Sequence, residues 1–176
     1  MDYLLEGEET DRLLFRKLVP ADFDDWLPFH KNPLSSQFWE GLPKDPEIAC
    51  QQQFDRVFER YENRLGGMNA LIHKYSGHLI GLCGLLVQAV DGMEELEIGY
   101  SILPEHWKKG YATEAAVKCK TFAFANNLVH SLISIIQVDN IPSQKVAISN
   151  GMHLDKTTIY NANRVHIFRV YKAKNN

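Results

Sequence analysis

The stretch LPEHWKKGYATEAA, residues 103–116, places two lysines and a glycine where an apolar run gives way to an alanine-rich, helix-prone segment. The first N–H groups of a helix have no partner inside the helix and carry partial positive charge, so they attract phosphate groups. Gly110 and Ala112 would let a ligand approach this backbone closely. Lys108 and Lys109 would add positive charge at the rim. The segment suits a diphosphate, because each exposed contact is worth only about 0.3–1 kcal/mol and several must act together.

A plain solvated turn explains the same residues equally well, and the segment alone does not decide between the two interpretations. The chain contains neither of the two commonest phosphate-loop patterns, GxxxxGK[ST] and GxGxxG. A phosphate site here must therefore depend on another kind of loop.

The carboxylate of Glu97 stands in the run EELEIGYSIL, residues 94–103. Strand alternation divides this run into one face with Leu96, Ile98, Tyr100 and Ile102 and another with Glu95, Glu97, Gly99 and Ser101. Between apolar neighbours, Glu97 could be a general base with a raised pKa. The alternative is an ordinary solvent-facing strand residue.

Asn140 and Ser143 stand at the start of an expected short helix in VDNIPSQKVAISNGM, residues 138–152. Helix capping alone would account for both residues. If they contact a ligand instead, the surrounding elements must position them beside it.

Those elements follow from spacing and turn signals. We expect strands at 11–18, at three runs within 67–103 separated by Ser76-Gly77 and Asp91-Gly92, at 130–138, and at two runs around the turn 161–163. We expect helices after Pro20, at 46–64, at 110–126 and within 140–151. This order predicts an α/β (α+β) fold with a mixed sheet, and it excludes a doubly wound dinucleotide fold, which needs βα alternation from the start.

Composition limits the class of protein. With 176 residues, 45% of them hydrophobic and 23% charged, the chain is typical of one globular domain over residues 1–176 that needs no metal or disulfide to build a core. The three separated cysteines, Cys50, Cys83 and Cys119, favour a reducing, cytoplasmic setting, and we expect the last two to pack in the core.

Charge and hydropathy limit the partners. The start of the chain lacks the features of a signal peptide and no run reaches 18 apolar residues, so no membrane association is expected. The net charge of −3 gives no general attraction for nucleic acid and mildly favours a cationic partner. The seven histidines lack metal-ligand spacing, so we expect no metal.

Two motifs together carry a family resemblance. LEIGYSILPEHWKKGYATEAA, followed by DNIPSQKVAISNGM, resembles the GNAT superfamily of N-acetyltransferases, and in particular its branch of ribosomal-protein N-terminal acetyltransferases. ETDRLLFRKLVPADFDDW also resembles the opening of that branch, so the likeness covers nearly the whole chain. It implies about seven strands with a splay between the fourth and fifth, about four helices, and acetyl-CoA as co-substrate in the gap.

The resemblance also implies roles for individual positions. The pantetheine arm would pair with strand-four backbone around Ile102 and Leu103, and Asn140 and Ser143 would contact pantetheine and lie near the sulfur. Loop amides would hold the diphosphate, here those of Lys108, Lys109, Gly110, Tyr111, Ala112 and Thr113. The family loop commonly has Arg or Gln where this chain has Trp107, which leaves Lys108 and Lys109 to supply the positive charge.

The implied reaction is direct attack of a neutral amine on the thioester, with Glu97 as base, directly or through a water. Ser143 would supply a proton or hydrogen bond to the leaving thiolate, with Tyr100 and Tyr160 as weaker candidates. Deprotonation at pH 7 costs roughly 1 kcal/mol for an α-amine and roughly 4.6 kcal/mol for a lysine-like amine. The acceptor, a protein N-terminus or a small amine, is not fixed by the sequence.

Acceptor recognition would fall to the loop 29–44 and the hairpin 159–166. Four aromatic residues in or just before that loop, Trp26, Phe29, Phe38 and Trp39, would either wall an apolar slot or pack over the sheet edge. Two alternatives stay open: a catalytically silent acyl-CoA-binding module, and a structural domain without a ligand. Dimers are common in the family, which leaves a homodimer open for this chain.

Overall fold

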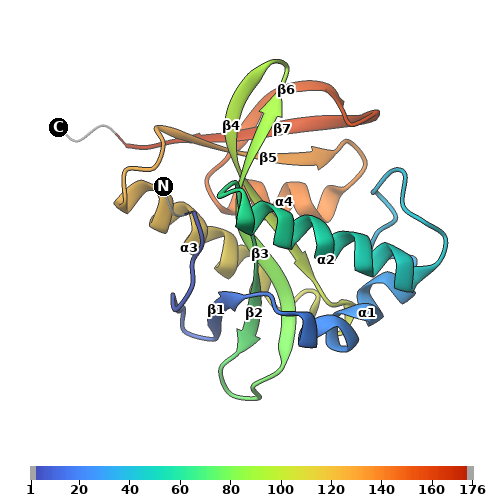
Figure 1. Ribbon diagram of the computed structural model, residues 1–176. Helices are drawn as coiled ribbons and strands as arrows, with labels where there is room; N and C mark the ends of the chain where they lie inside the picture. Colours follow the sequence, from blue (N-terminus) through green and yellow to red (C-terminus); the bar gives the residue numbers. More distant parts are fainter. Residues whose placement is uncertain (1–2, 174–176) are drawn as a thin grey trace.

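A seven-stranded sheet forms the centre of the protein in a computed structural model that describes residues 3–173. Its strands are β1 (Leu13–Lys17), β2 (Gly66–His73), β3 (Leu79–Val90), β4 (Met93–Ile102), β5 (Ser131–Gln137), β6 (His153–Tyr160) and β7 (Asn163–Tyr171). Their order across the sheet is β1-β2-β3-β4-β5-β7-β6 (Figure 1). All neighbouring pairs are antiparallel except β4 and β5, which are parallel. The expected mixed sheet is confirmed.

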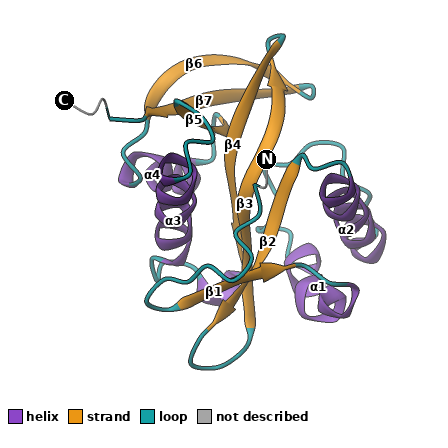
Figure 2. Ribbon diagram, turned by 60° about the vertical axis from the view of Figure 1, so that its left-hand side comes forward, coloured by secondary structure: helices purple, strands orange, loops and turns teal. Residues whose placement is uncertain are grey.

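Four α-helices cover the sheet, as expected, and two 3-10 turns precede helices along the chain. The helices are α1 (Phe23–Lys31), α2 (Pro46–Glu62), α3 (Tyr111–Ala125) and α4 (Ile141–Ser149), and the 3-10 turns are Pro20–Asp22 and Pro104–His106. Figure 2 shows α1 and α2 on one side of the sheet and α3 and α4 on the other. The chain therefore builds two apolar layers, one beneath each pair of helices.

The layers differ in their side chains. Beneath α1 and α2, large aromatic residues such as Trp26, Phe29 and Phe54 are almost completely buried. Beneath α3, small residues such as Ala115 and Ala116 let the helix lie close to the central strands. The alanine-rich sequence of α3 thus serves close packing of the helix that follows the lysine-containing loop.

β4 and β5 part soon after they meet. Glu97 and Ile133 are their one registered pair among the described residues. Beyond it, Ser134 Oγ donates to the Ile98 carbonyl oxygen at 2.8 Å, so a side chain occupies an acceptor that a continuing ladder would give to a backbone N–H. The expected splay between strands four and five is confirmed, and it opens toward the C-terminal end of β4.

The predicted boundaries agree with the structure to within a few residues. Both expected hairpin turns are present, and Asp91 and Gly92 both have positive φ, as does Gly77. The last turn is shorter than predicted, because Asn161 and Ala162 make it in the left-handed region and Asn163 already belongs to β7. Each element was therefore predicted in the right place, with its ends a few residues off.

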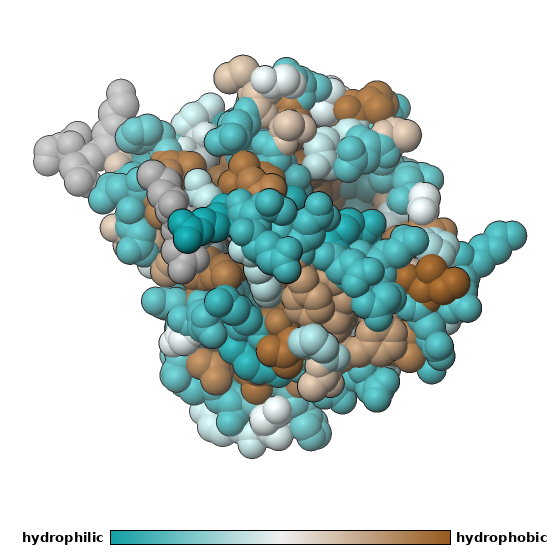
Figure 3. All heavy atoms as spheres, in the orientation of Figure 1, coloured by the Kyte–Doolittle hydropathy of each residue, from teal (hydrophilic) through white to brown (hydrophobic). Residues whose placement is uncertain are grey.

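The surface is mixed in character. In the space-filling view, hydrophobic atoms lie in scattered groups between hydrophilic ones (Figure 3). Across residues 3–173, no helix combines the length and the apolar character that crossing a membrane requires.

Candidate active site

A cavity of about 410 Å³ lies where β4 and β5 separate. Its walls come from the segment before α2, the central strands β3 to β5, the start of α4 and the β6–β7 hairpin. Glu97, Asn140 and Ser143, which the sequence singled out from three separate segments, all line it. The parting of two strands thus creates a space that collects these side chains.

Glu97 faces this cavity rather than open solvent. Its Oε2 accepts a hydrogen bond from Gln88 Nε2 at 2.7 Å. Burial is the largest influence on its pKa and raises it, while the Gln88 amide, the Ile135 backbone N–H and the nearby Arg60 guanidinium act in the opposite direction. The net result is a raised pKa, as expected for a carboxylate that must accept a proton near neutral pH.

Ser143 and Asn140 lie at the start of α4. Asn140 Oδ1 accepts from the Ser143 N–H at 3.2 Å, so Asn140 does cap this helix. This bond uses only one end of the amide. The Tyr100 hydroxyl donates to the Ser143 backbone carbonyl at 2.7 Å, and burial raises its pKa. The Tyr100 proton is therefore held by the backbone, whereas Ser143 is one of the residues that line the cavity.

The end of β4 meets the gap with its backbone. The Leu103 N–H donates to the Ile80 carbonyl at 2.9 Å, and the Leu103 carbonyl accepts from the His106 N–H at 2.9 Å. Successive residues of a strand point their backbone N–H and C=O groups to opposite sides. Because the Leu103 N–H points to β3, the N–H and C=O of Ile102 point away from β3. Its carbonyl accepts from Trp107 Nε1 at 2.7 Å. Trp107, which the sequence left unexplained, fixes the junction between β4 and the loop.

The loop and the first turn of α3 have the backbone geometry of an anion site. Lys108 and Gly110 have φ values of 60° and 83°, which turn the chain sharply into the helix. Gly110 occupies the N-cap position, and among the described residues no side chain caps α3. The N–H groups of Tyr111, Ala112 and Thr113 therefore open the helix without a side-chain acceptor, which leaves their positive potential for a ligand.

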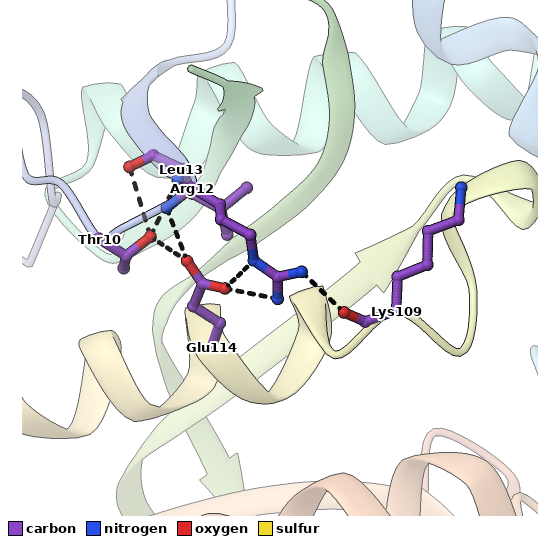
Figure 4. A network of polar contacts seen from close by, with 5 residues as sticks. All are labelled: Thr10, Arg12, Leu13, Lys109 and Glu114. Atoms are coloured by element: carbon purple, nitrogen blue, oxygen red, sulfur yellow. Dashed lines mark hydrogen bonds and ion pairs between the residues drawn. The ribbon is translucent and has the colours of Figure 1, made fainter. Parts of the chain in front are cut away.

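Arg12 and Glu114 hold this loop from behind (Figure 4). Arg12 Nη1 donates to the Lys109 carbonyl at 2.9 Å, and Arg12 Nε donates to Glu114 Oε2 at 2.6 Å. The other oxygen, Oε1, accepts from the Thr10 hydroxyl at 2.6 Å and from the Arg12 N–H at 3.0 Å. The guanidinium also lies over the Tyr111 ring, 4.2 Å from its centroid. The segment before β1 thus fixes the loop that leads into α3.

Two segments expected to meet an acceptor do lie together. Asn163 Nδ2 donates to the Phe38 carbonyl at 3.0 Å, which joins the β6–β7 hairpin to the segment between α1 and α2. Phe38 and Trp39 line the cavity. Trp26 and Phe29 are instead 0% and 2% exposed in the core, so the four aromatics divide between the two interpretations.

Gln88, Arg12 and Glu114 are functional candidates that sequence reasoning missed. Gln88 did carry a signal, since it is the one polar residue among the apolar residues of LIGLCGLLVQAV. Arg12 and Glu114 carried none, because they lie 102 positions apart and only the tertiary structure joins them.

All three cysteines are buried, and for Cys83 and Cys119 this confirms the expectation. Cys83 and Cys119 are 0% exposed with their sulfur atoms 3.6 Å apart, and Cys50 is also buried. Burial raises the pKa of the Cys50 thiol to about 11. None of the three lines the cavity, so thiol chemistry there has no support from geometry.

Comparison with protein families gives a direct match. The model described as "Acetyltransferase (GNAT) domain" matches residues 12–153. The matched segment runs from Arg12 through the loop 103–110 to the start of β6, and so includes most of the site described above.

Individual relatives share about a quarter to a third of their aligned residues with this chain. "Uncharacterized protein YkkB" of Bacillus subtilis (strain 168) is 36% identical over 84 residues, which are 48% of this chain and 49% of that protein. The match therefore spans about half of that relative's length. "Uncharacterized N-acetyltransferase YoaA" of the same strain is 26% identical over 144 residues, 81% of this chain and 80% of that protein.

Solved structures show the same fold. An acetyltransferase from Agrobacterium tumefaciens str. C58 superimposes with a TM-score of 0.80 over 98% of both chains at 24% identity. Spermidine N-acetyltransferase from Vibrio cholerae, in complex with CoA and spermine, superimposes with a TM-score of 0.72 at 15% identity, over 92% of this chain and 96% of that one.

Proposed function

This chain belongs to the GNAT acetyltransferases, and we propose that it transfers an acetyl group from acetyl-CoA to a primary amine, with Glu97 as general base and Ser143 as the partner of the leaving sulfur. The observation that carries these roles is that one cavity holds both side chains at the point where β4 and β5 separate. The acceptor is a protein N-terminus or a small amine.

The start of α3 fits the diphosphate of acetyl-CoA. The uncapped N–H groups of Tyr111, Ala112 and Thr113 offer several donors at one place. Lys108 and Lys109 are exposed beside them, with the Lys109 ammonium donating to the Glu105 carbonyl at 2.9 Å. These residues would hold the diphosphate mainly through backbone donors, with the lysines adding charge.

The end of β4 fits the pantetheine arm. Ile102 directs its backbone toward the gap, while both backbone groups of Leu103 already have partners within the chain. We therefore assign the pairing to the Ile102 N–H, with Leu103 as a support for the strand end. Asn140, whose amide is only half used by capping, would contact the arm from the opposite wall.

When bound, acetyl-CoA supplies the thioester carbonyl as the electrophile. Glu97 takes a proton from the acceptor nitrogen, directly or through a water, so that the nitrogen lone pair is free to attack. The Ser143 hydroxyl donates a hydrogen bond or proton to the sulfur as the carbon–sulfur bond breaks. Glu97 later releases this first proton to solvent, and the second proton that the nitrogen loses as the amide forms goes to the sulfur, directly or by replacing the one that Ser143 gives, so the step balances and no covalent enzyme intermediate forms.

The charge of the cavity favours a cationic acceptor. Among the described residues that line it, Glu40 and Glu97 are the only ones with a charged side chain. A protonated amine would therefore be drawn in before it loses its proton to Glu97. An α-amine needs roughly 1 kcal/mol for that loss at pH 7 and a polyamine nitrogen considerably more, so both classes belong in the test.

Thermal unfolding with and without acetyl-CoA, followed by thiol-release assays, tests the proposal. We expect millimolar acetyl-CoA to raise the melting temperature, and CoA to be released with at least one of a panel of free-N-terminus peptides, polyamines and small primary amines. N-acetylated copies of the same peptides are the matched control and should give no release. The absence of any stabilisation would contradict acetyl-CoA binding, and stabilisation without turnover would favour a silent acyl-CoA-binding module.

A further inference from the structure

The amide of Gln88 connects Glu97 to Tyr160. Gln88 Nε2 donates to Glu97 Oε2 at 2.7 Å, and Gln88 Oε1 accepts from the Tyr160 hydroxyl at 2.9 Å. An ionised carboxylate can only accept and the phenol donates here, so both ends of the amide are committed and its orientation is fixed. Side chains from β4, β3 and β6 thus form one continuous row along the cavity wall.

This row reaches the hairpin that we expect to contact the acceptor. Tyr160 is the last residue of β6 and pairs with Asn163, the first residue of β7. Asn163 in turn donates to the Phe38 carbonyl, and Phe38 belongs to the other acceptor segment. Two hydrogen bonds, from Tyr160 to Gln88 and from Gln88 to Glu97, therefore connect the hairpin to the Glu97 carboxylate.

We propose that Gln88 and Tyr160 are positioning residues for the acetyl transfer, and that they orient the Glu97 carboxylate and tie it to the acceptor hairpin. This role rests on the function proposed above. Both residues act through Glu97 rather than on the reacting atoms. An acceptor that seats against the hairpin would then also set the geometry of the base.

Replacing Gln88 or Tyr160 should raise the pKa of Glu97. Donors to the ionised carboxylate favour the charged form, so losing one raises the Glu97 pKa and moves the active, deprotonated base to higher pH. Other elements contribute groups that stay in place when Gln88 or Tyr160 is changed. These are Arg60 of α2, the Ile135 N–H of β5, Tyr100 of β4 and Glu40 of the segment before α2.

The test compares Gln88→Met and Tyr160→Phe with the unchanged protein. The pH at which kcat/KM reaches half its maximum should rise by about one unit in Gln88→Met, with a smaller rise in Tyr160→Phe. At the alkaline end, where Glu97 is deprotonated in every form, both variants should still be slower than the unchanged protein, because the carboxylate has lost a partner that orients it. Tyr171→Phe is the matched control, since Tyr171 is an exposed tyrosine of β7 outside the cavity, and its profile should not move.

A second measurement does not depend on turnover. Carbon-13 NMR of protein labelled at the glutamate carboxyl, with the Glu97 signal assigned by its loss in Glu97→Gln, gives the titration midpoint directly. An upward shift in both folded variants supports the positioning role, and an unchanged midpoint in both overturns it. If no amine is acetylated by any form of the protein, the proposed function fails while this titration still reports the Gln88 and Tyr160 contacts.

Discussion

Arg169 on β7 reaches across β5 to form two hydrogen bonds with the Glu95 carboxylate on β4. Its Nη2 lies 2.7 Å from Oε1 and its Nη1 lies 3.0 Å from Oε2. The same guanidinium donates to Asp155 on β6 and to Ser131 on β5. Four strands are joined by one side chain, two positions along β4 from Glu97. The splay is thus fixed at its closed end, which lets the other end stay open for ligands.

Arg169→Met should destabilise the protein by about 3 kcal/mol, because it leaves Glu95 partly buried without its cation. The measurement is chemical denaturation at pH 7. Arg164→Met, an exposed arginine on the same strand, is the control and should cost less than about 0.5 kcal/mol. Equal losses in the two variants would show that Arg169 does not fix the strands in this way.

Glu97→Gln should lower turnover by roughly 10²-fold at pH 7, which is the lower end of the range for loss of a general base. The affinity for acetyl-CoA should be nearly unchanged. The carboxylate works deprotonated, so kcat/KM of the unchanged protein should rise with pH through the raised Glu97 pKa and then level off. The variant should lack this rise. If its activity equals that of the unchanged protein across pH 6–9, Glu97 is not the base.

The same substitution has an effect on stability that does not involve catalysis. Because burial raises the pKa of Glu97 above its unfolded value, the neutral form is favoured in the folded state. This contribution is fully present below the unfolded pKa and is lost as pH rises through the folded pKa. The melting temperature of Glu97→Gln relative to the unchanged protein should therefore increase between pH 4 and pH 8. A constant difference would show that the carboxyl is not desolvated.

Arg12→Gln should weaken acetyl-CoA binding roughly fivefold, or about 1 kcal/mol, since both partners are partly exposed. The KM of the acceptor should change little, because Arg12 contacts the loop and α3 and does not line the cavity. Calorimetric titration with acetyl-CoA measures the first effect. Lys17→Gln, which removes a cation from the exposed Lys17–Glu6 pair, is the matched control and should bind normally.

Gly110→Ala and Gly77→Ala separate backbone strain from ligand binding. Both glycines have positive φ, 83° and 71°, so each substitution should cost about 1 kcal/mol of stability. A Cβ at Gly77 meets nothing within 4 Å, whereas one at Gly110 lies 3.4 Å from Arg12 Nη2 at the start of α3. Only Gly110→Ala should weaken acetyl-CoA binding. Equal affinities in the two variants would remove the loop from the cofactor site.

The sequence was informative about the fold because turns, periodicity and motif order are local. Residue pairs such as Ser76-Gly77 and Asp91-Gly92 favour tight turns because of their own conformational preferences. In the structure these two pairs lie in the turns that connect β2 to β3 and β3 to β4. Glu97 and Ser143 were selected as candidates because each stands in a recognisable motif, and the structure places both at one cavity.

The connections between these residues could not be predicted in the same way. The bond from Gln88 to Glu97 depends on the register of β3 and β4, and the bond from Tyr160 to Gln88 on the approach of β6 to that pair. The backbone of Leu103 is likewise engaged by contacts, to Ile80 and His106, that only the folded loop defines.

The hydrogen bond from the Trp107 indole to the Ile102 carbonyl makes the fluorescence of Trp107 sensitive to changes at this loop. The chain has three tryptophans, of which Trp26 is buried in the core with its indole bonded to Gln53, and Trp39 lines the cavity on the side that we propose for the acceptor. Indole emission changes with local polarity and hydrogen bonding. Trp107 would therefore signal events at the loop and Trp39 events at the acceptor side, with Trp26 as a constant background, so unlabelled protein can report which of its two substrates has arrived.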